Sequence, residues 1–168
     1  MKRENGFSLI ELLIVVAIIL IIAAMAIPNL LRARIAANES SAASSVRKIA
    51  TAEVAYNTAF PTQGYAPLLA NLGGPATGCT PSSATACILD SVLSSGIKSG
   101  YTFVGVGFAQ SSTINTSFVA GSAPQQYDIT GDRLFCVVTD GVLRIDPGAA
   151  GTPVANTVAL CTAYPLSQ

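Results

Sequence analysis

The chain has 168 residues, enough for one domain besides a membrane segment. Its nine basic residues balance nine acidic residues, and only 11% of residues are charged, so no basic field would attract nucleic acid by bulk electrostatics. The chain contains no histidine, P-loop or G-x-S-x-G motif. Because histidine is the commonest general base and metal ligand, we expect neither catalysis nor a cofactor.

The first predicted element is an apolar helix over residues 7–27, interrupted only by Ser8 and Glu11. At about 1.5 Å per residue it reaches roughly 31 Å, about the thickness of a bilayer's hydrocarbon core. The basic residues of segment 1–6 predict a cytoplasmic N-terminus. No A-x-A cleavage site follows the helix. The helix is therefore either an uncleaved anchor, or the chain is cut before the helix, after Gly6.

The stretch G-F-S-L-I-E-L-L-I-V-V, from Gly6 to Val16, resembles the processing site of type IV pilins and of the related type II secretion pseudopilins. The resemblance rests on the glycine, the aromatic residue after it and Glu11, and it extends more loosely to about Phe60. It implies that a prepilin peptidase cuts between Gly6 and Phe7 and that the new Phe7 amine is methylated.

A lone carboxylate in hydrocarbon costs at least about 2.5–3.5 kcal/mol. We therefore expect Glu11 to pair with the Phe7 amine of a neighbouring subunit, which would set the register between subunits. The alternatives are a pair within one chain, since four residues make one turn, or a carboxylate that reaches the headgroups. The corresponding domains are a leader (1–6), a transmembrane and assembly helix (7–28) and a pilin head (29–168).

Pro28 removes one backbone donor, so we expect a kink or local unwinding at residues 24–28, or the end of one helix and the start of another. The resemblance favours one long, bent helix that continues to Ala59. Arg32 and Arg34 can meet lipid phosphates before assembly or acidic neighbours after it, or remain solvated. The distal half has an apolar face that is suited to cover a sheet, formed by Ile35, Ala42, Val46, Ile49, Ala52 and Tyr56.

Beyond the helix, residues 61–84 are rich in proline and glycine and predict an irregular connection. Residues 85–95 predict a short helix, with Gly96 just past its end. The remainder predicts an α+β domain, in which four antiparallel strands pack on the distal half of the long helix. The expected strands are residues 100–109, 114–120, 134–139 and 142–146. A two-residue Asp140-Gly141 hairpin joins the last two, and Val158–Leu160 can add an edge segment.

All four cysteines follow the apolar segment, and an even count in an exported domain favours disulfides. Of the three possible connectivities we favour Cys79–Cys87, which closes a short loop, and Cys136–Cys161, which pins the tail to a strand. A cysteine pair often bounds the C-terminal region of pilins, and Cys136 and Cys161 match that placement. Without a C-x-x-C pair or histidine, a zinc site is disfavoured.

Asp128, Asp132 and Asp140 raise the question of calcium, because type II secretion pseudopilins can hold that ion in this part of the fold. The segment around the first two lacks the dense oxygen spacing of an EF-hand loop. Turn formation accounts for Gly131-Asp132 and for Asp140-Gly141, so we expect no metal.

The leading interpretation is a structural subunit of a type IV pilus, held in the bacterial inner membrane and then polymerised with copies of itself into an extracellular filament. The resemblance implies a prepilin peptidase and an inner-membrane assembly platform with a separate ATPase as partners. It also implies adhesion, twitching motility or DNA uptake as roles. The alternatives are a type II secretion pseudopilin and a singly anchored exported domain that never polymerises.

Overall fold

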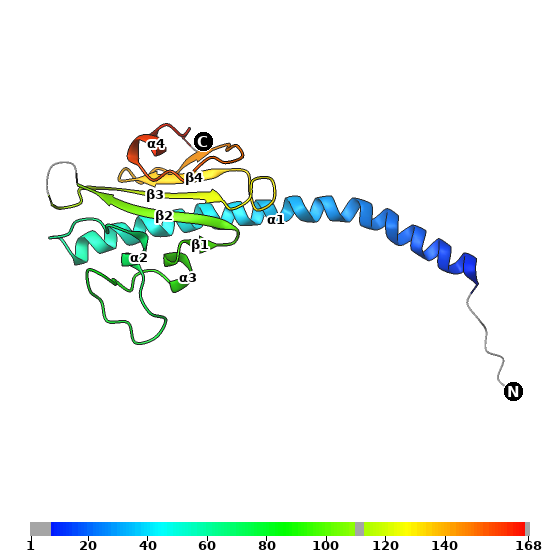
Figure 1. The fold of residues 1–168 in the computed structure, drawn as a ribbon, viewed down its shortest axis with the longest axis horizontal. Helices are drawn as coiled ribbons and strands as arrows, with labels where there is room; N and C mark the ends of the chain where they lie inside the picture. Colours follow the sequence, from blue (N-terminus) through cyan, green and yellow to red (C-terminus); the bar gives the residue numbers. More distant parts are fainter. Residues whose placement is uncertain (1–7, 110–112, 167–168) are drawn as a thin grey trace. The chain divides into compact units, whose positions relative to one another are not determined.

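The computed structural model describes residues 8–109 and 113–166. The chain divides into two compact units, the first ending at Arg34 and the second beginning at Ile35. One long helix, α1 (Leu9–Ala59), contributes to both units. The second unit, called the head below, contains the other helices and strands of the described chain (Figure 1).

In the first unit, α1 is continuous and its apolar side chains are exposed. Helical structure runs unbroken through Pro28, so the predicted local unwinding and the alternative of two separate helices are both wrong. A single proline withdraws only one donor from the hydrogen-bond ladder, and the aliphatic and alanine-rich sequence on both sides favours helix. Leu9 is 80% exposed and Ile27 is 67% exposed. This apolar surface therefore has no cover within the described chain.

In the head, α1 supplies the apolar face that covers one side of the sheet. Of the six residues predicted on that face, five are buried and Ile35 is half-buried. They pack with Tyr101, Phe103 and Phe118 from the strands into the main core. The helical spacing in the sequence therefore predicted the packing face correctly. The five buried members are Ala42, Val46, Ile49, Ala52 and Tyr56.

The sheet has five antiparallel strands in sequence order, which confirms the α+β fold. The extra strand is β1, only two residues long, and it pairs with the start of β2. The strand predicted over residues 114–120 is β3, which begins three residues later and ends four residues later. The bounds are β1 (Ile97–Lys98), β2 (Tyr101–Phe108), β3 (Ser117–Pro124), β4 (Leu134–Val138) and β5 (Arg144–Asp146).

Three segments between the main elements differ from the sequence expectation. The helix expected over residues 85–95 is only α3 (Ser91–Ser94), which Asp90 caps by accepting a hydrogen bond from the Leu93 amide at 2.9 Å. A second one-turn helix, α2 (Leu69–Leu72), lies within the connection predicted to be irregular. The two-residue hairpin at Asp140-Gly141 is wrong, because β4 ends at Val138 and β5 begins at Arg144.

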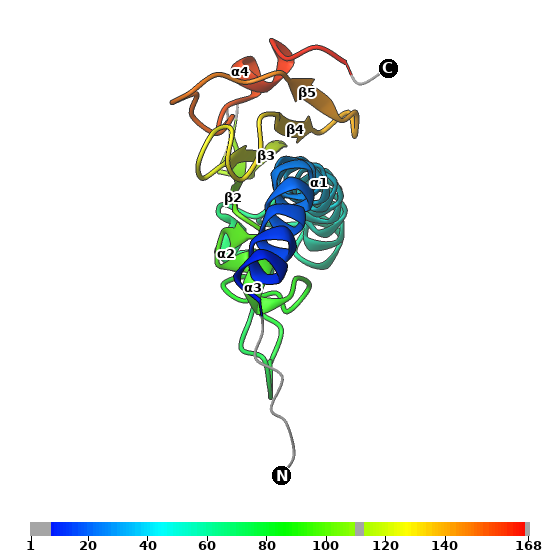
Figure 2. The ribbon, with the colours of Figure 1, turned by 90° about the vertical axis from the view of Figure 1, so that its right-hand side faces the viewer.

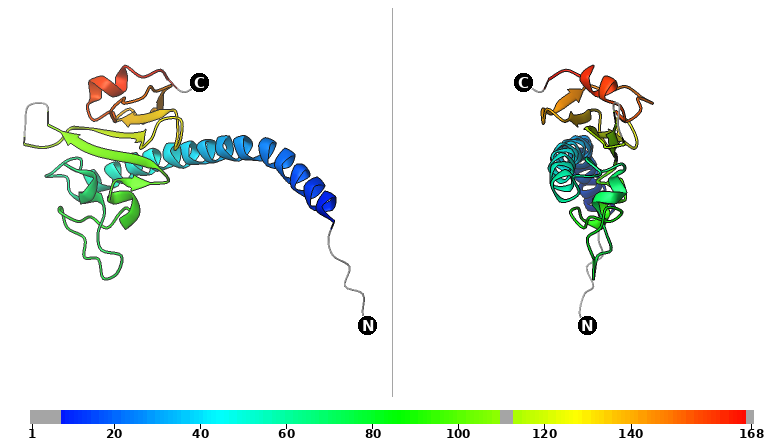
Figure 3. Two further views of the ribbon diagram at one scale, coloured as in Figure 1. Left: turned by 45° about the vertical axis from the view of Figure 1, so that its right-hand side comes forward. Right: turned by 90° about the vertical axis from the view of Figure 1, so that its left-hand side faces the viewer.

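The C-terminal tail covers the face of the sheet opposite α1, as the end-on view of the head shows (Figure 2). The edge segment expected at Val158–Leu160 is instead part of α4 (Val158–Thr162), which Thr157 caps at the Leu160 amide. A β-bridge to Arg144 forms later in the tail, at Leu166. The head is thus a three-layer unit of helix, sheet and tail (Figure 3).

Candidate assembly site and the groups that hold the head together

Glu11 lies in the first turn of α1, within the exposed apolar surface. Its Oε2 accepts a hydrogen bond from the Ser8 amide at 3.0 Å, and the Ser8 carbonyl accepts from the Glu11 amide at 3.1 Å. A carboxylate is stabilised at this end of a helix, where backbone N–H groups lack partners and the dipole is positive. Glu11 forms no ion pair within the described residues. One of its oxygens is therefore available to a cation from outside that part of the chain.

The two predicted processing residues, Gly6 and Phe7, lie outside the described residues. The described part of the apolar segment has the dimensions of a membrane span. By length and composition α1 is able to cross a bilayer, and the apolar stretch that qualifies it has no buried residues. An exposed patch of this extent on a protein marks a surface that lipid or another protein covers.

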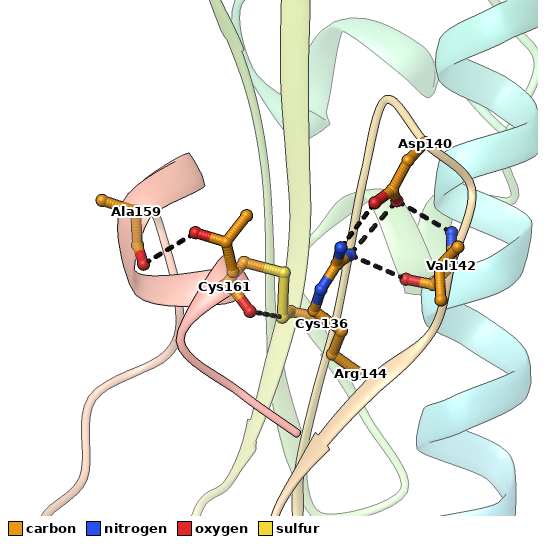
Figure 4. Close-up of polar contacts among 7 residues, drawn as sticks. Cys136, Asp140, Val142, Arg144, Ala159 and Cys161 are labelled. Atoms are coloured by element: carbon orange, nitrogen blue, oxygen red, sulfur yellow. Dashed lines mark hydrogen bonds and ion pairs between the residues drawn. A yellow bond between two sulfur atoms is a disulfide. The ribbon is translucent and has the colours of Figure 1, made fainter. Parts of the chain in front are cut away.

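The cysteines pair as predicted, Cys79 with Cys87 and Cys136 with Cys161. The second bond joins β4 to α4, and both of its cysteines are fully buried (Figure 4). It fixes the tail against the sheet. The first closes the loop that precedes α3.

Asp140 and Arg144 form an ion pair across the connection between β4 and β5 (Figure 4). The Arg144 Nη1 donates to Asp140 Oδ1 at 3.1 Å and to the Val142 carbonyl at 3.2 Å. The hydrogen bonds from Arg144 hold the pKa of Asp140 below its ordinary value. The Asp140-Gly141 turn is therefore present, but it lies within a five-residue connection between β4 and β5 that the Asp140–Arg144 ion pair stabilises. Among the described residues, no group of three or more acidic or cysteine side chains is arranged to hold a metal ion.

Glu39 fastens the loop between β3 and β4 to α1. Its Oε1 accepts from the backbone amides of Asp132 at 3.0 Å and Arg133 at 3.1 Å, and its Oε2 pairs with the Arg133 guanidinium at 2.6 Å. Burial of Glu39 opposes ionisation, but these charge-assisted hydrogen bonds outweigh it and hold the pKa below its ordinary value. Glu39 is therefore an anionic anchor for a backbone turn.

Glu53 is a second anchor on the same face of α1, and it is completely buried. Its Oε2 accepts from the Ala66 amide at 2.8 Å, while its Oε1 has no hydrogen-bond partner within the described chain. Burial raises the pKa of Glu53 to about 8, and the Ala66 amide offsets only part of this effect. At neutral pH the folded head therefore holds this carboxyl mainly in its protonated form.

Neither glutamate was predicted from the sequence as a functional group. The signal was present, because Glu39 precedes Ala42 by three residues and Glu53 follows Ile49 by four, which places both acids on the apolar face. An acid on such a face must find donors from another element when the face is buried.

Comparison with known proteins places a known motif over the apolar segment. The family described as the prokaryotic N-terminal methylation motif matches residues 1–27. The chain carries this motif. The match includes Gly6, Phe7 and Glu11, the residues on which the resemblance to type IV pilins rests, and it ends before Pro28.

Two curated proteins that are similar to this chain are type IV pilins. The type IV wide pilus major component PilA4 of Thermus thermophilus is 62% identical over 40 residues, which is 24% of this chain and 30% of that protein. The type IV major pilin protein PilA of Myxococcus xanthus is 44% identical over 54 residues, 32% of this chain and 24% of that protein. The chain thus spans less than a third of the length of either relative. No solved structure matches the chain.

Proposed function

We propose that this chain is a structural subunit of a type IV pilus. The observation that carries the proposal is Glu11, a carboxylate in an exposed apolar helix that coincides with the methylation motif. The exposed apolar side chains of this helix must be shielded from water both before and after assembly. Lipid would shield them in the membrane-bound precursor, and the helices of neighbouring subunits would shield them in a filament. In that role the head, with its two disulfides, forms the outside of the fibre.

Charge neutralisation gives the assembly step its specificity. Cleavage after Gly6 would create a cation at Phe7, next to the helix end where Glu11 lies. The Ser8 amide donates to Oε2, and Oε1 of Glu11, which has no ion-pair partner among the described residues, would accept the methylated Phe7 amine of the next subunit. A carboxylate that costs at least about 2.5–3.5 kcal/mol in hydrocarbon would then favour one register over all others. The precursor would wait in the bacterial inner membrane, where a prepilin peptidase, an assembly platform and a separate ATPase would act on it.

The decisive variant is Glu11→Ala, with Ser8→Ala as the matched control. We expect Glu11→Ala to insert in the membrane at the wild-type level and to reduce sheared surface fibres at least tenfold. Ser8→Ala keeps the carboxylate and should still form fibres, because the Ser8 donor is a backbone amide. Wild-type fibre yield from Glu11→Ala would refute the role of the carboxylate.

Mass spectrometry of the native N-terminus tests the processing step. The proposal predicts a mature chain that begins at methylated Phe7. An intact Met1 would instead identify a singly anchored domain. Electron microscopy of sheared surface fractions distinguishes the remaining alternative, because a type II secretion pseudopilin forms no long surface fibres under normal expression. Adhesion, twitching motility and DNA uptake are each tested by deleting the chain in its host.

A further inference from the structure

The head carries two charged surfaces that do not neutralise each other. The first is a cationic pair, Arg47 and Lys48, both exposed on α1. The two side chains border an open groove between α1 and residues 88–90. Asp90 lines the same groove, but its carboxylate caps α3, and neither cation has an ion-pair partner within residues 8–109 and 113–166.

The second surface is the turn of residues 126–132, called the acidic turn here. Asp128 and Ile129 are exposed at its tip, and Ile129 is 57% exposed. Asp132 adds a half-buried carboxylate whose Oδ1 has no hydrogen-bond partner in the described chain. Burial raises the pKa of Asp132, and the negative charges of Asp128 and Glu39 raise it further. Neither Asp128 nor Asp132 forms an ion pair within the described residues, so no cation among them neutralises the turn.

The acidic turn is rigidly attached to α1, which fixes its position relative to the cationic pair. The Asn38 amide nitrogen donates to the Thr130 carbonyl at 3.0 Å, and Glu39 binds the backbone amides at the end of the turn. Arg47 follows Asn38 by nine residues, and Lys48 follows Glu39 by nine. Nine residues are 2.5 helical turns, so the cations lie about 14 Å further along the axis and on the opposite side of the helix. No ion pair joins the two surfaces within the described residues of one head.

We infer that Arg47 and Lys48 of one subunit dock against the acidic turn of a second copy of this chain. A contact between two different surfaces of one molecule does not close on itself and generates an open assembly, the geometry that a filament needs. The contact requires an axial offset between heads of about 14 Å along α1, with Ile129 covering the apolar part of the groove beside the cations. This inference rests on the proposed polymerisation.

Charge reversal and charge exchange in the full-length chain test the contact. We expect Arg47→Glu combined with Lys48→Glu to reduce fibre yield at least tenfold, and Asp128→Asn to reduce it severalfold. Adding Asp128→Lys to the double variant should restore fibres to within about threefold of wild type. The control is Lys98→Glu on β1, which reverses one cation where the double variant reverses two, and it should leave fibre yield unchanged.

The outcomes separate this contact from the proposed function. Thermal unfolding in detergent and the membrane level of each variant show that the head is folded. Wild-type yield from the folded Arg47 and Lys48 double variant would overturn the contact and leave polymerisation standing. Loss of fibres without recovery by Asp128→Lys would mean that the cations meet another partner, such as lipid phosphate, and would also overturn it. Absence of fibres from the wild-type chain would refute the proposed function itself.

Discussion

The carboxyl group of Glu53 makes the stability of the head depend on pH. Burial sets its pKa at about 8 in the folded chain, against an ordinary value of 4.5. Between these values the folded chain binds more protons than the unfolded chain, so the free energy of unfolding falls as pH rises from about 4.5 to about 8. At 1.36 kcal/mol per pKa unit, the full difference is about 5 kcal/mol. About 3 kcal/mol of this is lost between pH 4.5 and pH 7.

Glu53→Gln removes the titration and keeps a side-chain oxygen to accept from the Ala66 amide. We expect the free energy of unfolding of the variant, relative to wild type, to rise by about 3 kcal/mol from pH 4.5 to pH 7. The assay is chemical denaturation of the full-length chain in detergent micelles, followed by circular dichroism at several pH values. A relative stability that stays constant across this range would refute the argument that Glu53 is buried and protonated.

Two further predictions concern the other groups that hold the head together. Glu39→Gln removes an anionic acceptor whose pKa is lowered in the folded state, so it should destabilise the head by on the order of 2 kcal/mol at pH 7. The loss of stability caused by Glu39→Gln should become smaller below pH 4.5, because wild-type Glu39 is then protonated as well. The Glu53 carboxyl has the opposite pH dependence. A loss of stability that grows in acid would contradict the lowered pKa of Glu39. Cys136→Ser with Cys161→Ser opens a loop with a sequence separation of 25 and should cost about 3.5 kcal/mol. The matched Cys79→Ser and Cys87→Ser pair, with a separation of 8, should cost about 1 kcal/mol less by thermal unfolding, and the reverse order would contradict the chain-entropy argument.

The parts of the fold that follow from local pattern could be predicted from the sequence. The apolar face of α1 has a helical period, so five of its six expected members are buried. The cysteine pairs were predicted because one loop is short and the other pair joins the tail to a strand. The limits of the β strands were less accurate, since strand pairing depends on partners distant in sequence.

The tail shows why the rest could not be predicted. Val158 and Leu160 have strand-like apolar character, and a segment of five residues is too short for propensity to decide. The structure is helical there because Thr157 caps the turn and the disulfide of Cys161 holds it against β4. The prediction of a two-residue hairpin at Asp140-Gly141 was wrong for a related reason, because the Asp140–Arg144 ion pair stabilises a connection longer than two residues.

Glu39 and Glu53 together explain how one helix organises the head. They lie fourteen residues apart on α1, about 21 Å along its axis, and nearly on one face. Each carboxyl group accepts hydrogen bonds from backbone amides of a different loop, residues 132–133 at one end and residue 66 at the other. Apolar packing alone does not fix the axial position of a helix on a sheet, because neighbouring registers bury similar area. Two polar anchors at the ends of the apolar face remove that freedom, since a shift by one turn would leave both acids buried without donors. The acidic turn is therefore held at a defined distance from Arg47 and Lys48, which a repeating contact between copies requires.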